Sequence, residues 1–237
     1  LGTSMPVGPG WLLWLDSNTK QAATATKTGA LRSIHLSPTI TWSDVDTSFN
    51  LVGNPFPSAI DLGDDTGWTF PNVEETIWVY DAATTNYLYR TTAGGGDKGS
   101  GIIPLGQGFF VHASAADPIF TIPASARIHS IQAFYKGPDQ TNGYEAYATI
   151  TATQDKYDDE VWVSFAENGS ANFENGWDAS KMFVREESPQ LFLTEGNRDL
   201  SIDHLYTLGE SERMVNMSFI AWAEGQQTLT ANLERLP

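Results

Sequence analysis

The sequence predicts an all-β protein made of two packed antiparallel β-sandwich domains of jelly-roll or immunoglobulin-like type. Aromatic residues make up 12% of the chain, and 21 Gly and 12 Pro supply frequent turns, a composition that favours strands joined by tight connections. Short runs of alternating apolar and polar residues recur, separated by turn formers. Helical periodicity is scarce, and only DASKMF at 178–183 suggests a turn or two of helix.

Strand-like runs follow one another along the whole chain. The apolar run WLLWL at 11–15 is typical of a core strand. The remaining expected strands lie within 76–91 (two strands around a polar turn), 108–114, 118–124, 144–153, 161–167, 190–196, 200–208, 214–225 and 227–236. Their spacing is close to that of an all-β sandwich.

The hairpin expected at 76–91 carries four large aromatic residues. Because side chains alternate along a strand, Trp78 and Tyr80 lie on one side of the first strand. Tyr87 and Tyr89 likewise share one side of the return strand.

The stretch NLVGNPFPSAID at 50–61 predicts a rigid corner after a strand. Asn54 and Phe56 each precede a proline, which disfavours the α region for both. The restricted backbone loses little entropy on folding, and we expect Phe56 to insert into the core.

Two segments repeat one pattern of proline, aliphatic residue, glycine, any residue, glycine and aromatic residue. PVGPGWLLW at 6–14 resembles PLGQGFFVH at 104–112. Proline fixes φ, and glycine permits positive φ or close approach, so both segments are expected to form similar loop-to-strand corners.

The turn-rich stretch 134–143 suggests a boundary near residue 138. Residues 1–138 are then an irregular, loop-rich β-domain containing the GNPFPS corner, and residues 139–237 a more regular antiparallel β-sandwich. The final LTANLERLP follows strand-like alternation and favours a chain that continues in a longer protein.

Charge and composition narrow the possible partners. With 13 basic and 29 acidic residues the net charge is −16, which disfavours nucleic acids and anionic membrane surfaces. The sequence contains no Cys, which excludes disulfides, thiolate nucleophiles and Cys-based metal sites. No apolar run reaches membrane-spanning length, and LGTSMPVGPG at the start lacks the features of a signal peptide.

LVGNPFPSAID, then IWVYD and NYLYR, then IPLGQGFFVHA, together resemble a β-rich region of secreted and cell-surface, adhesin-like proteins of Bacteroidetes-type bacteria. The later DDEVWVSF and ENGWDASKMF are similar to the β-sandwich that follows that region. The resemblance implies export by the type IX secretion route and a location outside the cell or on its outer surface. It brings no assigned catalytic residues.

Other motifs favour ordinary structural readings. GGGDKG at 94–99 matches G-x-G-x-x-G but leads into SGIIPLGQG, which cannot continue as the helix that a dinucleotide site needs. The four histidines are not at metal-ligand spacing, although His112 and His129 could meet across strands. Asp61, Asp64 and Asp65 lie in a glycine-containing loop that could bind calcium through oxygen ligands; a solvated acidic loop is the alternative. No other cofactor is expected.

The candidate binding residues are aromatic: Trp68, Trp78, Tyr80, Tyr87 and Tyr89. On an outward sheet face such rings could stack on sugars, although half of each alternating strand must be buried.

The sequence therefore predicts a non-catalytic module of an exported protein, adhesin-like and contacting glycans or surface and matrix proteins. The alternative is an accessory, carbohydrate-binding or structural region of a larger secreted hydrolase. A calcium-dependent enzyme with dispersed carboxylates is the third possibility.

Overall fold

The computed structural model shows an all-β chain. It describes residues 7–10, 29–44, 48–63, 67–81, 86–97, 100–130, 144, 146–155, 157–184, 188–207, 213–221 and 224–236. Within these ranges the one helix is a 3₁₀ turn at Ala124–Ala126. None of the helices described is long and apolar enough to cross a membrane.

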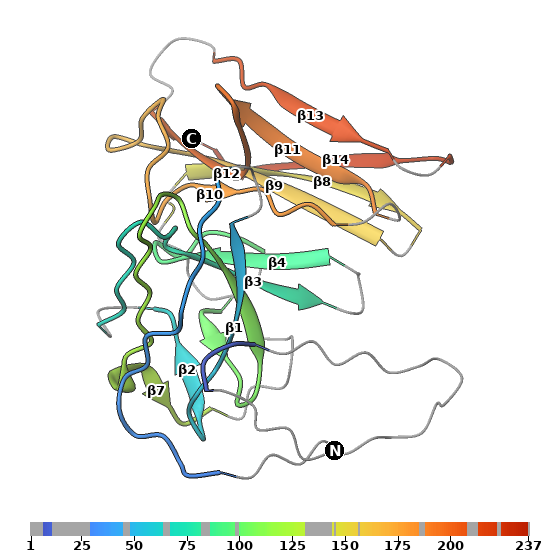
Figure 1. The fold of residues 1–237 in the computed structure, drawn as a ribbon. Coiled ribbons are helices and arrows are strands. Elements are labelled where there is room, and N and C mark those ends of the chain that lie inside the picture. Colours follow the sequence, from blue (N-terminus) through green and yellow to red (C-terminus); the bar gives the residue numbers. More distant parts are fainter. Residues whose placement is uncertain are drawn as a thin grey trace.

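The described strands form three sheets, which Figure 1 shows one below another, with the largest at the top. The first half of the chain contributes β1 (Phe49–Gly53), β2 (Ala59–Asp61), β3 (Thr76–Asp81), β4 (Asn86–Thr91), β5 (Ile102–Ile103), β6 (Gly108–His112) and β7 (Arg127–Ile128). The second half contributes β8 (Ala146–Gln154), β9 (Tyr157–Ala166), β10 (Ala179–Ser180), β11 (Gln190–Glu195), β12 (Arg198–Tyr206), β13 (Met217–Ile220) and β14 (Thr228–Arg235).

The first half forms a four-stranded sheet with the order β1-β6-β3-β4 and a small sheet with the order β5-β2-β7. Ile77 and Val79 of β3 and Phe109 and Val111 of β6 are buried in a common apolar core. The strands expected at 76–91 and 108–114 are thereby confirmed, whereas 118–124 makes only isolated bridges at Thr121 and Ile122.

The GNPFPS corner is fixed by one amide side chain. The Asn54 amide donates to the carbonyls of Ser58 and Pro104 at 2.8 and 3.0 Å, and its oxygen accepts from the Phe56 backbone amide at 3.0 Å. Phe56 is buried in the core of the four-stranded sheet, as the sequence predicts.

The two glycine corners lie on opposite edges of β1. Gly8 and Gly106 both have positive φ, at 116° and 78°. Gly8 accepts from the Gly53 amide at 2.9 Å, while Gly108 pairs with Gly53 from the β6 side. The repeated pattern therefore produces two related corners that flank one strand. The apolar run predicted as a strand at 11–15 lies outside the described residues.

The second half forms a seven-stranded sheet with the path β13-β11-β12-β9-β8-β14 and β10 beside β12. Val161, Val163 and Phe165 of β9 face its apolar core together with Ala146 and Ile150 of β8, which confirms the predicted alternation.

This sheet differs from the expected antiparallel sandwich in two places. β9 and β12 run parallel, and β10 takes the place of the helix that 178–183 suggested. Two residues of β10 span three of β12, an extra residue of the kind that bends a strand. One of the described sheets curls into a half-barrel. The all-β class is confirmed, whereas the two sandwich domains are not confirmed and stay a prediction.

An aromatic layer joins the two large sheets. It contains Trp78 and Tyr89 from the four-stranded sheet and Trp162 and Ile202 from the seven-stranded sheet, all buried. The division near residue 138 stays a prediction, because 131–143 lie outside the described residues, but the parts on either side of it share this core.

Candidate functional site

One face of the β3–β4 hairpin is aromatic. Trp78 pairs with Tyr89, and Tyr80 pairs with Tyr87, so the two pairs of rings that the sequence placed together within each strand share one side of the sheet. The same side carries Phe110 of β6, which pairs with Trp78.

Most of this aromatic face is covered by the seven-stranded sheet. Trp78 and Tyr89 have only 0% and 2% of their surface exposed. The Tyr89 hydroxyl donates to the carbonyls of Glu160 and Ser201 at 3.1 and 3.3 Å. These two residues belong to the protein interior, so they form no part of a surface that could stack on a ligand.

The Trp68 side chain is also held by contacts with other protein groups. Its ring packs against Phe70 and Phe120, and its indole nitrogen donates to the Asp61 carbonyl at 2.9 Å. The Trp68 ring is half-buried and packs against the core that contains Ile77 and Val79, on the side of β3 away from Trp78 and Tyr80.

Tyr80 and Tyr87 remain as the surface part of the predicted set. Tyr80 is 38% exposed, and its ring meets the half-buried Tyr87 ring at 5.4 Å. Tyr87 in turn meets Phe110 edge to face at 5.4 Å. We call these three residues the tyrosine edge. Its rings offer apolar faces, and the tyrosines add polar tips.

The seven-stranded sheet adds a second aromatic pair to the same layer. Tyr147 of β8 stacks on Trp162 of β9 at 4.6 Å with an interplanar angle of 16°. The Trp162 indole donates to the Glu160 carboxylate at 2.6 Å, and the Thr151 hydroxyl donates to it at 3.0 Å. Alternation along β8 and β9 was the sequence signal that could have found this pair, since it places both rings on the side away from Val161.

Two carboxyl groups in this region are strongly affected by burial. Burial raises the pKa of Glu160. Burial, followed by the charge of Glu160, raises the pKa of Asp97 well above its ordinary value. The Asp97 carboxylate also accepts from the Tyr89 backbone amide at 2.7 Å. A carboxyl that keeps its proton can donate as well as accept a hydrogen bond.

A buried Ser–His pair lies deeper in the seven-stranded sheet. The parallel register brings Ser164 beside His204, with 2.7 Å between the Ser164 hydroxyl and His204 Nδ1. The two residues are 0% and 1% exposed, and the ring stacks on Trp177 at 4.5 Å. Asp178 accepts from the backbone amide of His204 at 2.5 Å. The Asp178 carboxylate therefore bonds to the backbone of β12 rather than to the His204 ring, and the Ser164–His204 pair has no exposed nucleophile.

No sequence signal pointed to this pair, because Ser164 and His204 lie forty residues apart with no motif around either. Burial lowers the pKa of His204. The neutral ring can accept from or donate to Ser164 and packs as part of the core.

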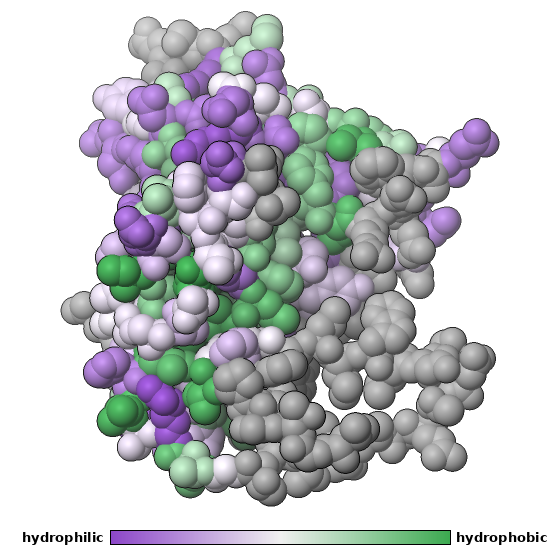
Figure 2. Space-filling model, viewed as in Figure 1, coloured by the Kyte–Doolittle hydropathy of each residue, from purple (hydrophilic) through white to green (hydrophobic). Residues whose placement is uncertain are grey.

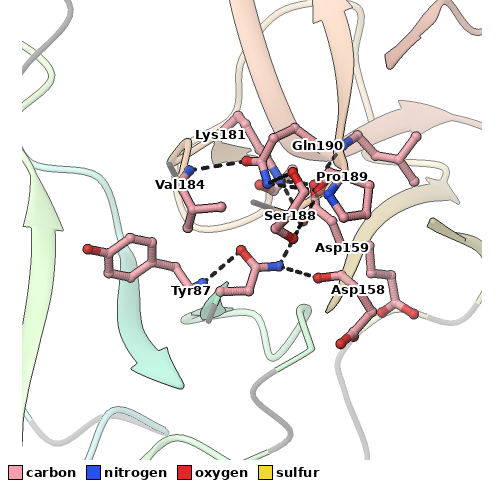
Figure 3. A network of polar contacts seen from close by, with 12 residues as sticks. Tyr87, Asp158, Asp159, Lys181, Val184, Ser188, Pro189 and Gln190 are labelled. Atoms are coloured by element: carbon pink, nitrogen blue, oxygen red, sulfur yellow. Dashed lines mark hydrogen bonds and ion pairs between the residues drawn. The ribbon is translucent and has the colours of Figure 1, made fainter. Parts of the chain in front are cut away.

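Two further buried groups, Glu74 and Asn86, connect the two sheets. The Glu74 carboxylate contacts His112 Nδ1 at 2.9 Å and accepts from the Ser180 hydroxyl at 2.6 Å. Figure 3 shows the second connection, in which the Asn86 amide of β4 donates to Asp158 and Asp159 of β9 at 2.9 and 3.1 Å. His112 therefore contacts a carboxylate, and no contact joins it to the exposed His129.

The calcium prediction rests on residues that are only partly described. The Asp61 carboxylate accepts from the Gly63 amide at 2.9 Å, which closes a local turn. Asp64 and Asp65 lie outside the described residues. Across the described ranges, no group of three acidic, histidine or cysteine side chains is arranged to hold a metal ion, so calcium binding stays a prediction.

The hydropathy of the surface is mixed. On the face drawn in Figure 2, hydrophilic side chains are densest in the upper part, where Figure 1 places the seven-stranded sheet, and hydrophobic residues appear in separate patches below.

No family model, no curated protein and no solved structure matches this chain.

Proposed function

We propose that this chain is a non-catalytic, adhesin-like module of an exported protein and that it contacts glycans or surface proteins through the tyrosine edge. The observation that carries the proposal is a difference in exposure: the buried polar groups bond to other protein groups, whereas one aromatic ring faces solvent. Glu74, Asn86 and the Ser164–His204 pair all bond to protein groups inside the fold. Tyr80, by contrast, presents an aromatic ring to solvent.

The geometry of Tyr80 and Tyr87 suits glycans best among these ligands. Tyr80 lies at 61° to Tyr87, so the two rings present an edge and a face side by side. Sugar rings have apolar faces that pack on aromatic rings and hydroxyl groups that bond to polar tips. The acidic net charge of −16 favours neutral or cationic ligands over anionic ones.

A binding screen with two variants tests this proposal. The folded chain is applied to an array of glycans and matrix proteins, and each hit is measured again with Tyr80→Ala and Tyr87→Ala. We expect each variant to weaken binding by about tenfold or more, the loss typical of an aromatic residue at the centre of an interface.

Tyr206→Ala is the matched control, because Tyr206 is 55% exposed on a different sheet. It should leave the affinity unchanged. Binding that survives both hairpin substitutions would place the ligand elsewhere, and a folded chain with no hits on the array would count against adhesion.

A further inference from the structure

A lysine and an aspartate form a closely approached pair inside the seven-stranded sheet. Lys181 Nζ lies 2.6 Å from Asp159 Oδ1 and 2.5 Å from Oδ2. Both side chains are only 2% exposed. An amine is thus held against both oxygens of one carboxyl group, where water has little access.

Two protein donors polarise the same carboxyl group. The Leu191 backbone amide donates to Asp159 Oδ2 at 2.6 Å, and the Asn86 side chain donates to Oδ1 at 3.1 Å. Leu191 and Asn86 belong to separate segments of the chain, and Figure 3 shows Asp159 and Lys181 within the polar network. Donors aimed at both oxygens stabilise the negative charge that develops when a nucleophile adds to the carboxyl carbon.

We propose that Lys181 and Asp159 condense into an intramolecular amide cross-link. A proton first passes from the ammonium to one carboxylate oxygen, which gives a neutral amine and a neutral carboxylic acid. The Nζ lone pair then attacks Cγ, the bond from Cγ to the protonated oxygen breaks, and that oxygen leaves as water with a second proton from Nζ. The ammonium and carboxylate thus become one amide and one water, and no oxidant or reductant is required.

The fold supplies what such a condensation needs. Holding two reactants in contact gives effective molarities of about 10⁵–10⁸ M for well-oriented groups. The product also removes two charges from the interior, and a buried ion pair carries a large desolvation cost. The released water leaves the dry site, which opposes hydrolysis.

Mass spectrometry tests the cross-link directly. The intact, denatured chain should be lighter than its sequence mass by one water, about 18 Da, as expected for a covalent change that removes water. Trypsin should fail to cut after Lys181 and should release residues 157–185 as one peptide. Digestion of that peptide after Glu residues should then yield two branches joined through Asp159 and Lys181.

Two other results would overturn the proposal. One is an unmodified mass with normal cleavage after Lys181, which leaves an ordinary ion pair. The other is a dehydrated chain whose fragments place the lost water away from these two residues.

Two variants test the assignment to Lys181 and Asp159. Lys181→Arg keeps a positive charge but should restore the full mass calculated from its sequence. Asp158→Asn changes the neighbouring carboxyl and should leave the cross-linked fraction intact; loss of the cross-link in Asp158→Asn would contradict the assignment to Asp159.

Discussion

At the scale of single residues, the fold depends on a few positions with special backbone or burial. Gly8 and Gly106 hold positive φ at the two corners beside β1. Asp178, Asp203 and His204 are buried ionisable residues in or beside β12. The glycines and the buried ionisable residues each lead to a separate prediction.

Gly106→Ala should destabilise the protein through its backbone alone. A Cβ at this position would meet no atom within 4 Å, so steric crowding plays no part. Positive φ costs a residue with a side chain about 1–2 kcal/mol, and we expect a loss of that size in urea unfolding. Gly29→Ala is the control, since Gly29 also has open space and lacks positive φ; equal losses at both positions would contradict the explanation.

Stability should rise as the pH falls from about 8 to about 5. Burial raises the pKa of Asp178 to about 7 and that of Asp203 to about 6, above the ordinary value of about 3.9 in unfolded chains. The folded state then binds more protons, so its stability is complete at low pH and is lost as pH rises through about 6 and 7. The lowered pKa of His204 acts in the opposite direction, but two carboxyls outweigh one imidazole.

Urea unfolding at about pH 8 and about pH 5 measures the difference in unfolding free energy. Asp203→Asn should reduce that difference. Asp117→Asn, at an exposed aspartate, should not. A stability that rises toward pH 8 in the wild-type chain would contradict the raised pKa values.

At the scale of elements, contacts between hairpins and neighbouring strands decide the architecture. Asn86 begins β4 yet bonds to Asp158 and Asp159 of β9, more than seventy residues away. β9 in turn pairs with β12 in parallel. Segments far apart in the sequence are therefore joined by side-chain hydrogen bonds and strand pairing rather than by turns.

Asn86→Ala should cost about 1–3 kcal/mol of unfolding free energy, the typical cost of leaving buried hydrogen-bonding groups unsatisfied. Chemical denaturation of the variant measures it. Asn168→Ala, at an exposed turn, should stay within about 0.5 kcal/mol of wild type. Similar effects at both positions would mean that the connection to β9 contributes little.

The sequence predicted the strands better than their pairing. Alternation identified β3, β4, β8 and β9 and the sides of their residues, because side-chain direction is a local property of a strand. It could not show the parallel pairing of β9 and β12, which depends on contacts between distant segments. It also suggested a helix near 178–183, where Ser180 instead bonds to Glu74 of the other sheet.

For the candidate site, the sequence predicted only which rings share a side within each strand. Alternation placed Trp78 with Tyr80 and Tyr87 with Tyr89, but the pairing of Tyr80 with Tyr87 is seen only in the folded hairpin. The burial of Trp78 and Tyr89 follows from the second sheet that covers them, and nothing in their own hairpin signals it. The approach of Lys181 to Asp159 likewise arises only in the folded chain.

At the scale of the whole molecule, the two large sheets share an aromatic layer and several buried polar connections. Trp78 and Tyr89 meet Trp162 and Ile202 in that layer, and Glu74 reaches Ser180 across it. A shared core predicts that the sheets fold and unfold together, in contrast to two domains joined by a linker.

Scanning calorimetry of the chain tests this central claim most directly. We expect a single transition whose calorimetric enthalpy equals its van't Hoff enthalpy, because loss of either sheet exposes the aromatic layer of the other. Two resolved transitions, or a calorimetric enthalpy well above the van't Hoff value, would show that the sheets are independent domains and would contradict the account.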